Sequence, residues 1–323
     1  MAPRFFNPSP MIRIIFFGTE NFAVPILNAL LSDPRFSVAA VVTKPDQPAG
    51  RGRAVTAPPI KKEATAVGIP IFQPEKLSDP KFVSALSAQK ADVAVVVQYG
   101  KIIPTAVLSL FPRGAVNVHG SLLPKYRGPS PIQTGLLNGE KETGVTIMLI
   151  DEEMDHGPIL SQERLAITAH DTSETLFTKL AEISARLLPE TIIKFLDGAL
   201  TPQPQNHRLA TYTKIIERED GRVRGDETPD DLERKLRAFT PWPGVFADLQ
   251  GKRIKILALS PLLKEKDEKF SEHQNVLRWW KTPAGQPALT VHKGSIILHR
   301  VQLEGGKAMD GTDFAHGYQR FFK

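Results

Sequence analysis

An amide and an imidazole stand two residues apart at the end of an apolar run, in Val116-Asn-Val-His-Gly120. Side chains alternate along a strand, so Asn117 and His119 are predicted to share one face. A carboxylate, Asp155, follows a second apolar run. An amide donor can stabilise an oxyanion, and an imidazole paired with a carboxylate can move a proton. These residue types together indicate acyl transfer through a tetrahedral centre.

His119 and Asp155 could each have a structural role instead of a catalytic one. A lone histidine near a strand end is usually structural, but His119 comes with Asn117, the following Ser-Leu-Leu-Pro loop and Asp155, which favours the functional interpretation. Asp151 also stands at the end of its apolar run. Its carboxylate competes with Asp155 for the catalytic role, although it could simply cap a turn.

Alternating strand and helix signals precede and surround these residues. Apolar runs predict strands at 12–17, 38–42, 69–72, 93–97, 115–118 and 145–150, and helical spacing predicts helices at 22–31, 59–67, 81–87 and 132–137. This alternation predicts an α/β fold, a Rossmann-like and mainly parallel sheet with helices on both sides. Ligands of such sheets bind beyond the carboxyl ends of the strands. Asn117, His119 and Asp155 follow such ends, so we expect them in one cleft.

The pattern changes near Thr201. A long amphipathic helix is predicted at 173–196, opened by a capping sequence from Asp171 to Glu174, and a proline-rich stretch follows at 197–206. Beyond it, a helix at 231–238 and strands at 245–249, 253–259, 288–292 and 295–301 suggest a small barrel. We therefore expect a catalytic domain at 1–200, a linker at 201–218 and a C-terminal domain at 219–323.

Composition excludes several classes. The 323 residues contain no cysteine, which excludes disulfides, a thiolate nucleophile and cysteine metal sites, and which fits the cytoplasm. The net charge of +6 is compatible with RNA but too modest to indicate it. Residues 1–10 are too short and broken for a signal peptide, and Met11 is an equally good start to the chain. No stretch is apolar enough to cross a membrane.

Several motifs together resemble the folate-dependent formyltransferases. They are the run from Asn117 to Gly128, Asp155-His-Gly157, Phe17-Gly-Thr19, residues 44–53, Val95 to Gly100 and Arg237 to Pro243, spread over nearly the whole chain. The resemblance implies formyl transfer from 10-formyltetrahydrofolate to the amino group of methionyl-initiator tRNA. We expect a monomer and no metal. It implies Asn117, His119 and Asp155 as catalytic residues, and an OB-like barrel that faces tRNA.

The resemblance also implies binding residues. The folate would contact two segments and one acidic residue: Tyr99, Gly100, Ile102, Pro104, Ser121, Leu122, Leu123, Pro124 and Asp151. A basic loop would contact the acceptor end of the tRNA through Arg51, with Arg53 and Lys44 nearby; on charge alone this loop would be taken as solvated.

Other features have more than one interpretation. Arg127 could hold a substrate anion, but we favour bracing of its own loop through carbonyl hydrogen bonds. Trp242 is expected in the barrel core or an interface rather than as a base-stacking platform. Gly18 lacks the two further glycines of a dinucleotide-binding turn, which disfavours NAD. The sequences at 221–226 and 263–272 depart from the family pattern, which weakens the tRNA assignment.

Two rival functions stay open. A glycinamide ribonucleotide or amino-sugar formyltransferase would keep the chemistry and change the acceptor; the former usually lacks a domain like that after Thr201. A catalytically silent RNA-binding protein could keep the barrel and the basic loop. It would not require Asn117, His119 and Asp155 together, so these residues discriminate between the two classes.

Overall fold

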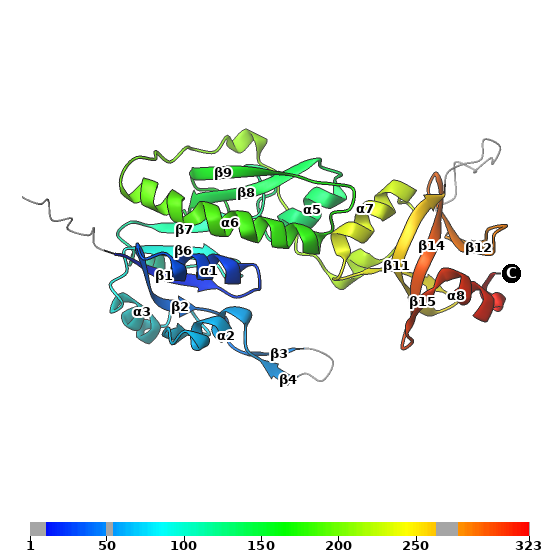
Figure 1. Cartoon of the computed structure of the whole chain (residues 1–323), viewed down its shortest axis with the longest axis horizontal. Coiled ribbons are helices and arrows are strands. Elements are labelled where there is room, and N and C mark those ends of the chain that lie inside the picture. Colours follow the sequence, from blue (N-terminus) through cyan, green and yellow to red (C-terminus); the bar gives the residue numbers. More distant parts are fainter. Residues whose placement is uncertain (1–10, 50–53, 263–276, 323) are drawn as a thin grey trace, which may run out of the picture. The chain divides into compact units, whose positions relative to one another are not determined.

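Most strands are followed by a helix through residue 196 of this computed structural model, which describes residues 11–49, 54–262 and 277–322 (Figure 1). In chain order the elements are β1 (Ile12–Gly18), α1 (Ala23–Ser32), β2 (Phe36–Val42), β3 (Gln47–Ala49), β4 (Ala54–Thr56), α2 (Pro59–Ala66), β5 (Ile71–Phe72), α3 (Pro80–Ser87), β6 (Val93–Val97), α4 (Thr105–Leu108), β7 (Ala115–His119), α5 (Pro131–Leu137), β8 (Glu142–Leu149), β9 (Ile159–Ala166) and α6 (Ser173–Leu196).

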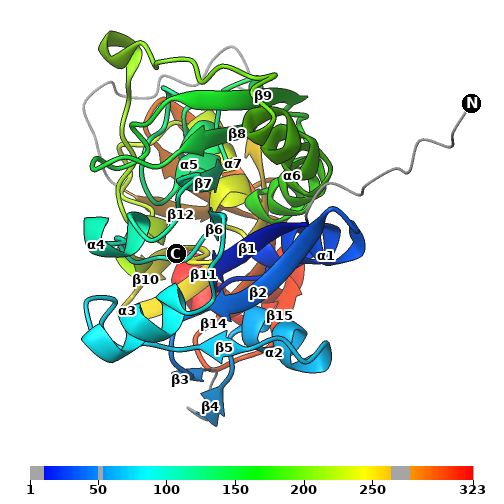
Figure 2. The same ribbon diagram turned by 90° about the vertical axis from the view of Figure 1, so that its left-hand side faces the viewer.

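Seven of these strands form one sheet in the order β5-β2-β1-β6-β7-β8-β9. β1 pairs in parallel with β2 and β6, and β6 pairs in parallel with β7, whereas β7 and β8 are antiparallel. Figure 2 shows α1, α2 and α6 on one side of the sheet and α3 and α4 on the other. The predicted Rossmann-like sheet, mainly parallel and covered on both sides, is confirmed.

The core of this sheet follows from its apolar runs. All five residues of β6, Val93 to Val97, are buried, as expected for a central strand with helices on both faces. On one face, Ile15 and Phe17 of β1 pack with Phe82 and Leu86 of α3. Burial of each such side chain contributes about 1.5–3 kcal/mol, which makes the sheet a rigid base for the loops at its edge.

Two local predictions differ from the structure. The sequence did not reveal β9, because this strand at the end of the sheet is largely exposed and contains four consecutive polar residues, Ser161 to Arg164, that interrupt the apolar pattern of a strand. The capping box of α6 is one residue later than predicted: the Thr172 hydroxyl accepts from the Thr175 N–H at 3.3 Å, and the Thr175 hydroxyl accepts from the Thr172 N–H at 3.0 Å.

The C-terminal part of the chain contains a curled antiparallel sheet. The elements that follow α6 in the chain are η1 (His207–Leu209), η2 (Arg218–Gly221), α7 (Pro229–Phe239), β10 (Val245–Leu249), β11 (Lys252–Leu262), β12 (Arg278–Lys281), β13 (Pro287–Val291), β14 (Gly294–Leu303), β15 (Ala308–Asp310), α8 (Gly311–Gly317) and η3 (Gln319–Phe322). The strands run in the order β10-β11-β14-β13-β12, with β15 on β14. The indole N–H of Trp279 in β12 donates to the Asp248 carbonyl in β10, at 3.3 Å, across the curl. This is the expected OB-like architecture.

Contacts divide the chain into two compact units. The first comprises Met1–Pro129, Glu142–Leu165 and Phe177–Thr213, and the second comprises Ser130–Lys141, Ala166–Leu176 and Lys214–Lys323. Helix α5 therefore belongs to the second unit, where Arg234 of α7 donates to the Leu137 carbonyl at 3.2 Å. None of the helices within the described ranges combines the length and apolarity that a bilayer span needs.

Trp242 and the stretch at 221–226 bear on two expectations that the sequence raised about the second unit. Trp242 is 56 % exposed and so is not a barrel-core residue. The unusual stretch at 221–226 is an ordered part of the unit: the Val223 N–H donates to the Phe246 carbonyl at 2.8 Å, and the Arg222 guanidinium lies over the Phe246 ring. The charged stretch at 263–272 lies outside the described residues.

A buried ion pair joins α7 to the stretch that precedes it. Lys235, which is 8 % exposed, donates to Glu227 at 2.7 Å and to the Arg222 carbonyl at 2.5 Å. The other oxygen of Glu227 accepts from the backbone N–H groups of Arg224 and Gly225. Burial raises the pKa of Glu227, but the hydrogen bond and charge of Lys235 and the two backbone donors outweigh burial, so this pKa lies below its ordinary value.

Replacing Glu227 by glutamine is expected to destabilise the second unit by about 3–5 kcal/mol, because Lys235 then keeps a buried charge without its counter-ion. All three tryptophans lie beyond residue 213, so their fluorescence during urea unfolding reports on this unit. Because the Glu227 pKa is lowered on folding, the wild-type contribution is complete above pH 4.5 and is lost as the pH falls below it.

The exposed pair of Glu219 and Arg222 supplies a matched control. Glu219→Gln is expected to move the urea midpoint far less than Glu227→Gln, because solvent screens an exposed pair. Equal midpoints for the Glu227 variant and the wild type would contradict a stabilising role for the buried pair.

Candidate active site

Strand β7 presents two of the predicted catalytic side chains on one face. Asn117 is half-buried, and His119, at the carboxyl end of the strand, is 6 % exposed. Parallel pairing of β6 with β7 places Val96 beside Asn117, so the segment after β6 leaves the sheet at the same edge as His119. The carboxyl-end rule therefore holds for these two residues.

Asp155 reaches the same place by a different route from the one expected. Because β8 is antiparallel to β7, its last residue, Leu149, lies opposite Val116, at the far end of β7 from His119. The loop after β8 folds back: Ile150 donates to the Ala115 carbonyl, and Leu149 donates to the Pro158 carbonyl. The prediction that Asp155 lies in the cleft because it follows a strand end is therefore wrong: β8 ends at the opposite edge of the sheet, and the loop after it brings Asp155 to Asn117 and His119.

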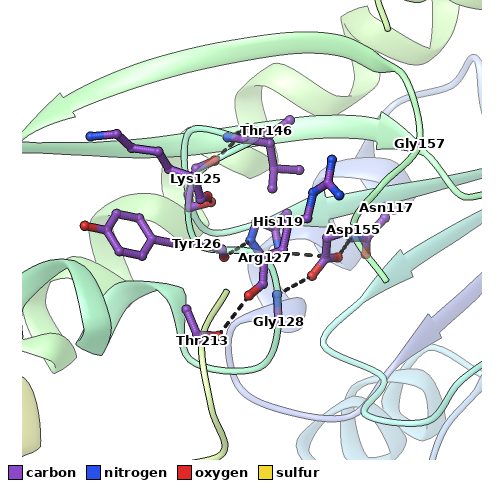
Figure 3. Close-up of polar contacts among 12 residues, drawn as sticks. Asn117, His119, Lys125, Tyr126, Arg127, Gly128, Thr146, Asp155, Gly157 and Thr213 are labelled. Atoms are coloured by element: carbon purple, nitrogen blue, oxygen red, sulfur yellow. Dashed lines mark hydrogen bonds and ion pairs between the residues drawn. The ribbon is translucent and has the colours of Figure 1, made fainter. Parts of the chain in front are cut away.

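The three side chains meet around the Asp155 carboxylate (Figure 3). Its Oδ1 accepts from Asn117 Nδ2 at 3.4 Å and lies 3.5 Å from His119 Nδ1. Its Oδ2 accepts from the Gly128 backbone N–H at 2.8 Å. Asp155 has a φ of +52°, a left-handed conformation that persists only where surrounding contacts fix it. The carboxylate is thus held at a defined position between the amide and the imidazole.

The orientation of His119 is set by a backbone group rather than by Asp155. Nε2 lies 2.9 Å from the Tyr126 carbonyl, and because a carbonyl only accepts, Nε2 carries the proton of the neutral ring. Nδ1 is then the basic nitrogen, and it faces Asp155. A proton taken up at Nδ1 would be shared with a carboxylate, which suits a group that accepts and returns a proton.

The loop that contains Tyr126 and Gly128 is held in place by hydrogen bonds from Ser121 and from Thr146 of β8. The Ser121 hydroxyl donates to the Lys125 carbonyl at 2.6 Å, and the Thr146 hydroxyl in β8 donates to the Ser121 carbonyl at 2.6 Å. The Leu123 N–H donates back to Thr146, and Ser121 and Leu123 are both buried.

The two other predicted folate residues of this segment also contact the protein. Leu122 packs beside Gly144, and the Pro124 carbonyl accepts from the Thr211 N–H at 3.3 Å. The predicted folate residues 121–124 therefore support this loop.

Arg127 braces the loop as favoured, but through side chains instead of carbonyls. It is 1 % exposed, and its guanidinium donates to Gln205 Oε1 and to His207 Nδ1, each at 2.8 Å. A contact of 3.4 Å joins it to the Tyr212 hydroxyl. A buried and paired guanidinium is not free to bind a substrate anion in this conformation.

The other predicted folate segment leaves β6 at the same edge of the sheet. Gly100, with a φ of +74°, follows Tyr99 directly, Ile102 is 86 % exposed and Pro104 precedes α4. Tyr99 is 1 % exposed and packs edge-on against Phe17, with ring centroids 5.5 Å apart. Burial raises the pKa of Tyr99 to about 12. Its ring belongs to the core, so a ligand would meet only its backbone.

Asp151 does not join Asn117, His119 and Asp155. Its carboxylate pairs with His156 Nδ1 at 2.6 Å and accepts from the Glu153 N–H at 3.1 Å, which is the turn-capping role considered from the sequence. The His156 ring stacks on the His207 ring, with centroids 4.0 Å apart and planes 5° apart. Asp151 thus fixes the outer part of the loop that carries Asp155.

Of the predicted tRNA contacts, only Lys44 is described. It follows β2, and its ammonium lies against Gly100, where a Cβ would collide with it. The structure therefore brings a predicted tRNA residue next to a predicted folate residue. Arg51 and Arg53 lie outside the described residues.

Several groups that build the cluster were not foreseen from the sequence. The Tyr126 carbonyl and the Gly128 N–H are backbone groups. Every residue type other than proline has both groups, so the sequence does not indicate which ones contact His119 and Asp155. Gly128 gives one signal: with a φ of +107°, a Cβ there would lie 2.8 Å from the Thr213 hydroxyl. Among residues 11–49, 54–262 and 277–322, no group of three or more His, Asp or Glu side chains is arranged to hold a metal.

Two family models match the chain. The model described as formyl transferase matches residues 12–192, and the model described as formyl transferase, C-terminal domain, matches residues 215–319. The methionyl-tRNA formyltransferase of Roseiflexus sp. (strain RS-1) is 42 % identical over 95 % of this chain and 92 % of its own. That of Myxococcus xanthus is 40 % identical over 95 % of both chains.

Solved structures share the fold at lower identity. HypX from Aquifex aeolicus, in complex with tetrahydrofolic acid, is 16 % identical with a TM-score of 0.61, over 98 % of this chain and 48 % of its own. An N-formyltransferase from Helicobacter canadensis, in complex with folinic acid and dTDP-3-aminofucose, is 20 % identical with a TM-score of 0.63, over 89 % of this chain and 99 % of its own. With both domains matched and relatives near 40 % identity along its length, the chain belongs to the formyl transferase family, in the group that contains the methionyl-tRNA formyltransferases.

Proposed function

We propose that this chain transfers the formyl group of 10-formyltetrahydrofolate to the amino group of methionyl-initiator tRNA, for translation initiation. The observation that carries the choice of acceptor is the match of 95 % of the chain to relatives named methionyl-tRNA formyltransferase. Two structural neighbours hold tetrahydrofolic acid and folinic acid, which supports a reduced folate as the donor.

In the proposed reaction the amine nitrogen attacks the formyl carbon, and the carbonyl oxygen becomes an oxyanion. One N–H of Asn117 is directed at Asp155, which leaves the other to donate to the oxyanion. His119 takes the amine proton at Nδ1, and Asp155 stabilises the imidazolium. The bond from carbon to N10 of the folate then breaks, and His119 returns the proton to N10. No covalent bond to the enzyme is formed.

We propose that the folate lies along the two segments at this edge of the sheet. Gly100, Ile102 and Pro104 would contact it with the backbone of Tyr99, next to the Asp151 loop. Ser121, Leu122, Leu123 and Pro124 would hold the wall of the site in place. The exposure of Ile102 and the burial of Ser121 and Leu123 support this division into contact and support.

We propose that Lys44, Arg51 and Arg53 contact the acceptor end of the tRNA. Arg51→Ala is expected to raise KM for charged tRNA, to lower the slope of log affinity against log salt by about one, and to leave KM for the folate unchanged. Arg13→Ala is the control, because Arg13 lies near the amino end of β1, the opposite edge of the sheet. Unchanged tRNA kinetics at physiological salt would contradict the assignment.

We also propose a division of labour along the chain, with formyl transfer in residues 1–200, a connection at 201–218 and tRNA binding by residues 219–323. The enzyme is proposed to act in the cytoplasm as a monomer. Light scattering should then give a mass of 35.7 kDa. A mass of twice that value would contradict the monomer.

The function is tested by offering three acceptors with the same folate donor: charged initiator tRNA, glycinamide ribonucleotide and a nucleotide-linked amino sugar. We expect formylation of the tRNA with a kcat/KM far above that of the others. Preference for either small acceptor would overturn the proposal while leaving the chemistry intact.

A further inference from the structure

A buried glutamine connects the two loops that hold the candidate catalytic groups. Gln205 is 5 % exposed and lies within the proline-rich stretch at 197–206, after α6. Its Nε2 donates to the Asp155 carbonyl at 2.9 Å and to the Gly157 carbonyl at 2.8 Å. Its Oε1 accepts from Arg127 Nη2 at 2.8 Å and from Nε at 3.3 Å. One amide thus makes four hydrogen bonds to the two loops.

The chemistry of the partners fixes the orientation of this amide. A guanidinium only donates and a carbonyl only accepts, so Oε1 must face Arg127 and Nε2 must face the two carbonyls. Among side chains of this size, an amide alone offers two donors and an acceptor without a charge. A carboxylate at the same place would face the carbonyls of Asp155 and Gly157 with a negative oxygen.

Arg127 stands between the two backbone groups that orient the catalytic side chains. The residue before it, Tyr126, accepts from His119, and the residue after it, Gly128, donates to Asp155. The Arg127 N–H donates to the Thr211 carbonyl at 2.8 Å, and its carbonyl accepts from the Thr213 N–H at 2.7 Å. Gln205 therefore connects the loop that orients His119 to the backbone of Asp155.

The backbone of Asp155 needs such a connection. A left-handed φ at a residue other than glycine costs of order 1–3 kcal/mol and is kept only by surrounding contacts. The Asp155 carbonyl is held by Gln205 and its carboxylate by Gly128 and Asn117. Gly157 packs so closely on the Leu149 carbonyl that a Cβ could not be accommodated, which fixes the other end of the turn.

We infer that Gln205 is a positioning residue for formyl transfer. It acts by holding the turn from Asp155 to Gly157, called the Asp155 turn, against the loop from Tyr126 to Gly128, which orients His119. The inference rests on the proposed catalytic role of Asp155. Gln205 itself is buried, and its amide is taken up by Arg127 and by the carbonyls of Asp155 and Gly157. Misplacement of a reacting group by about 1 Å can cost about 10²-fold in rate, so we expect an effect of that order on kcat.

Gln205→Glu is the main test variant, because it keeps an acceptor for the buried Arg127 and removes the two donations to the Asp155 turn. Single-turnover rates with excess enzyme are expected to fall about 10- to 100-fold, with KM for the folate changed little. Gln205→Met, which removes all four hydrogen bonds at similar volume, is the second variant. Gln203→Met is the matched control: this glutamine is exposed, its side-chain amide donates to the Thr201 carbonyl, and its backbone bonds to Ile159 are kept by methionine, so the rate should equal that of the wild type.

The same substitution in an Asp155→Asn background separates positioning from general support of the fold. If Gln205 acts through Asp155, Gln205→Glu should cause no further loss there. A folded Gln205→Glu enzyme with wild-type kcat, an equal fold-loss in the Asp155→Asn background, or failure of both Gln205 variants to fold would each overturn the inference. Wild-type kcat for Asp155→Asn alone would instead overturn the proposed role of Asp155.

Discussion

Replacement of His119 by alanine is expected to lower kcat for formylation of methionyl-tRNA by about 10²- to 10⁴-fold, the usual contribution of a positioned acid or base. The physical reason is the pairing of its two ring nitrogens: Nε2 is held by the Tyr126 carbonyl, and Nδ1 faces Asp155 at 3.5 Å. No other described imidazole lies against Asn117 and Asp155 to replace it. The measurement is a single-turnover rate with charged initiator tRNA.

Thermal unfolding and folate binding of the His119 variant should stay close to wild type, because the loss is in proton transfer. His170→Ala is the control, since that histidine is exposed and lies outside the catalytic cluster. A His119→Ala enzyme that turns over within a few-fold of wild type would show that the proton takes another path.

Replacement of Asn117 by alanine is expected to cost about 10²- to 10³-fold in kcat, the effect of removing one oxyanion donor. Asn117→Asp should cost at least as much, because a carboxylate would face both the developing oxyanion and Asp155, which lies 3.4 Å away. Steady-state kinetics with folate and tRNA varied separately should place both losses in kcat. Asn21→Ala, at an exposed position before α1, is the control.

The Asn117→Asp variant gives the sharper answer because its side chain has almost the same volume as the original. A turnover near that of wild type would mean that the amide does not donate to the oxyanion. A loss confined to KM for the folate would instead make Asn117 a residue for binding the donor.

The sheet was predictable where local sequence determines the outcome. Val93 to Val97 is a continuous apolar run with turn residues around it, and α6 has an apolar face over six turns, so both elements match their predicted bounds. Strand β9 was missed because four consecutive polar residues, Ser161 to Arg164, occupy its middle. The direction of β8 was not predictable, because local sequence does not say which way a strand runs beside its neighbour.

The same distinction applies to the candidate site. Asn117 and His119 share a strand, so alternation alone placed them together. Asp155 was identified by resemblance to a family motif, and its route back along β7 depends on how the chain turns after β8. Gln205 had no sequence signal, since a glutamine among prolines and polar residues looks like part of a solvated connection. Only the folded chain brings it to Arg127 and Asp155.

The most direct test of the catalytic assignment is a crystal structure of the enzyme with a non-transferable analogue of 10-formyltetrahydrofolate. We expect the formyl oxygen about 3 Å from Asn117 Nδ2, with His119 and Asp155 on the side from which the amine approaches. A donor whose formyl group is bound out of reach of all three side chains would contradict the central claim.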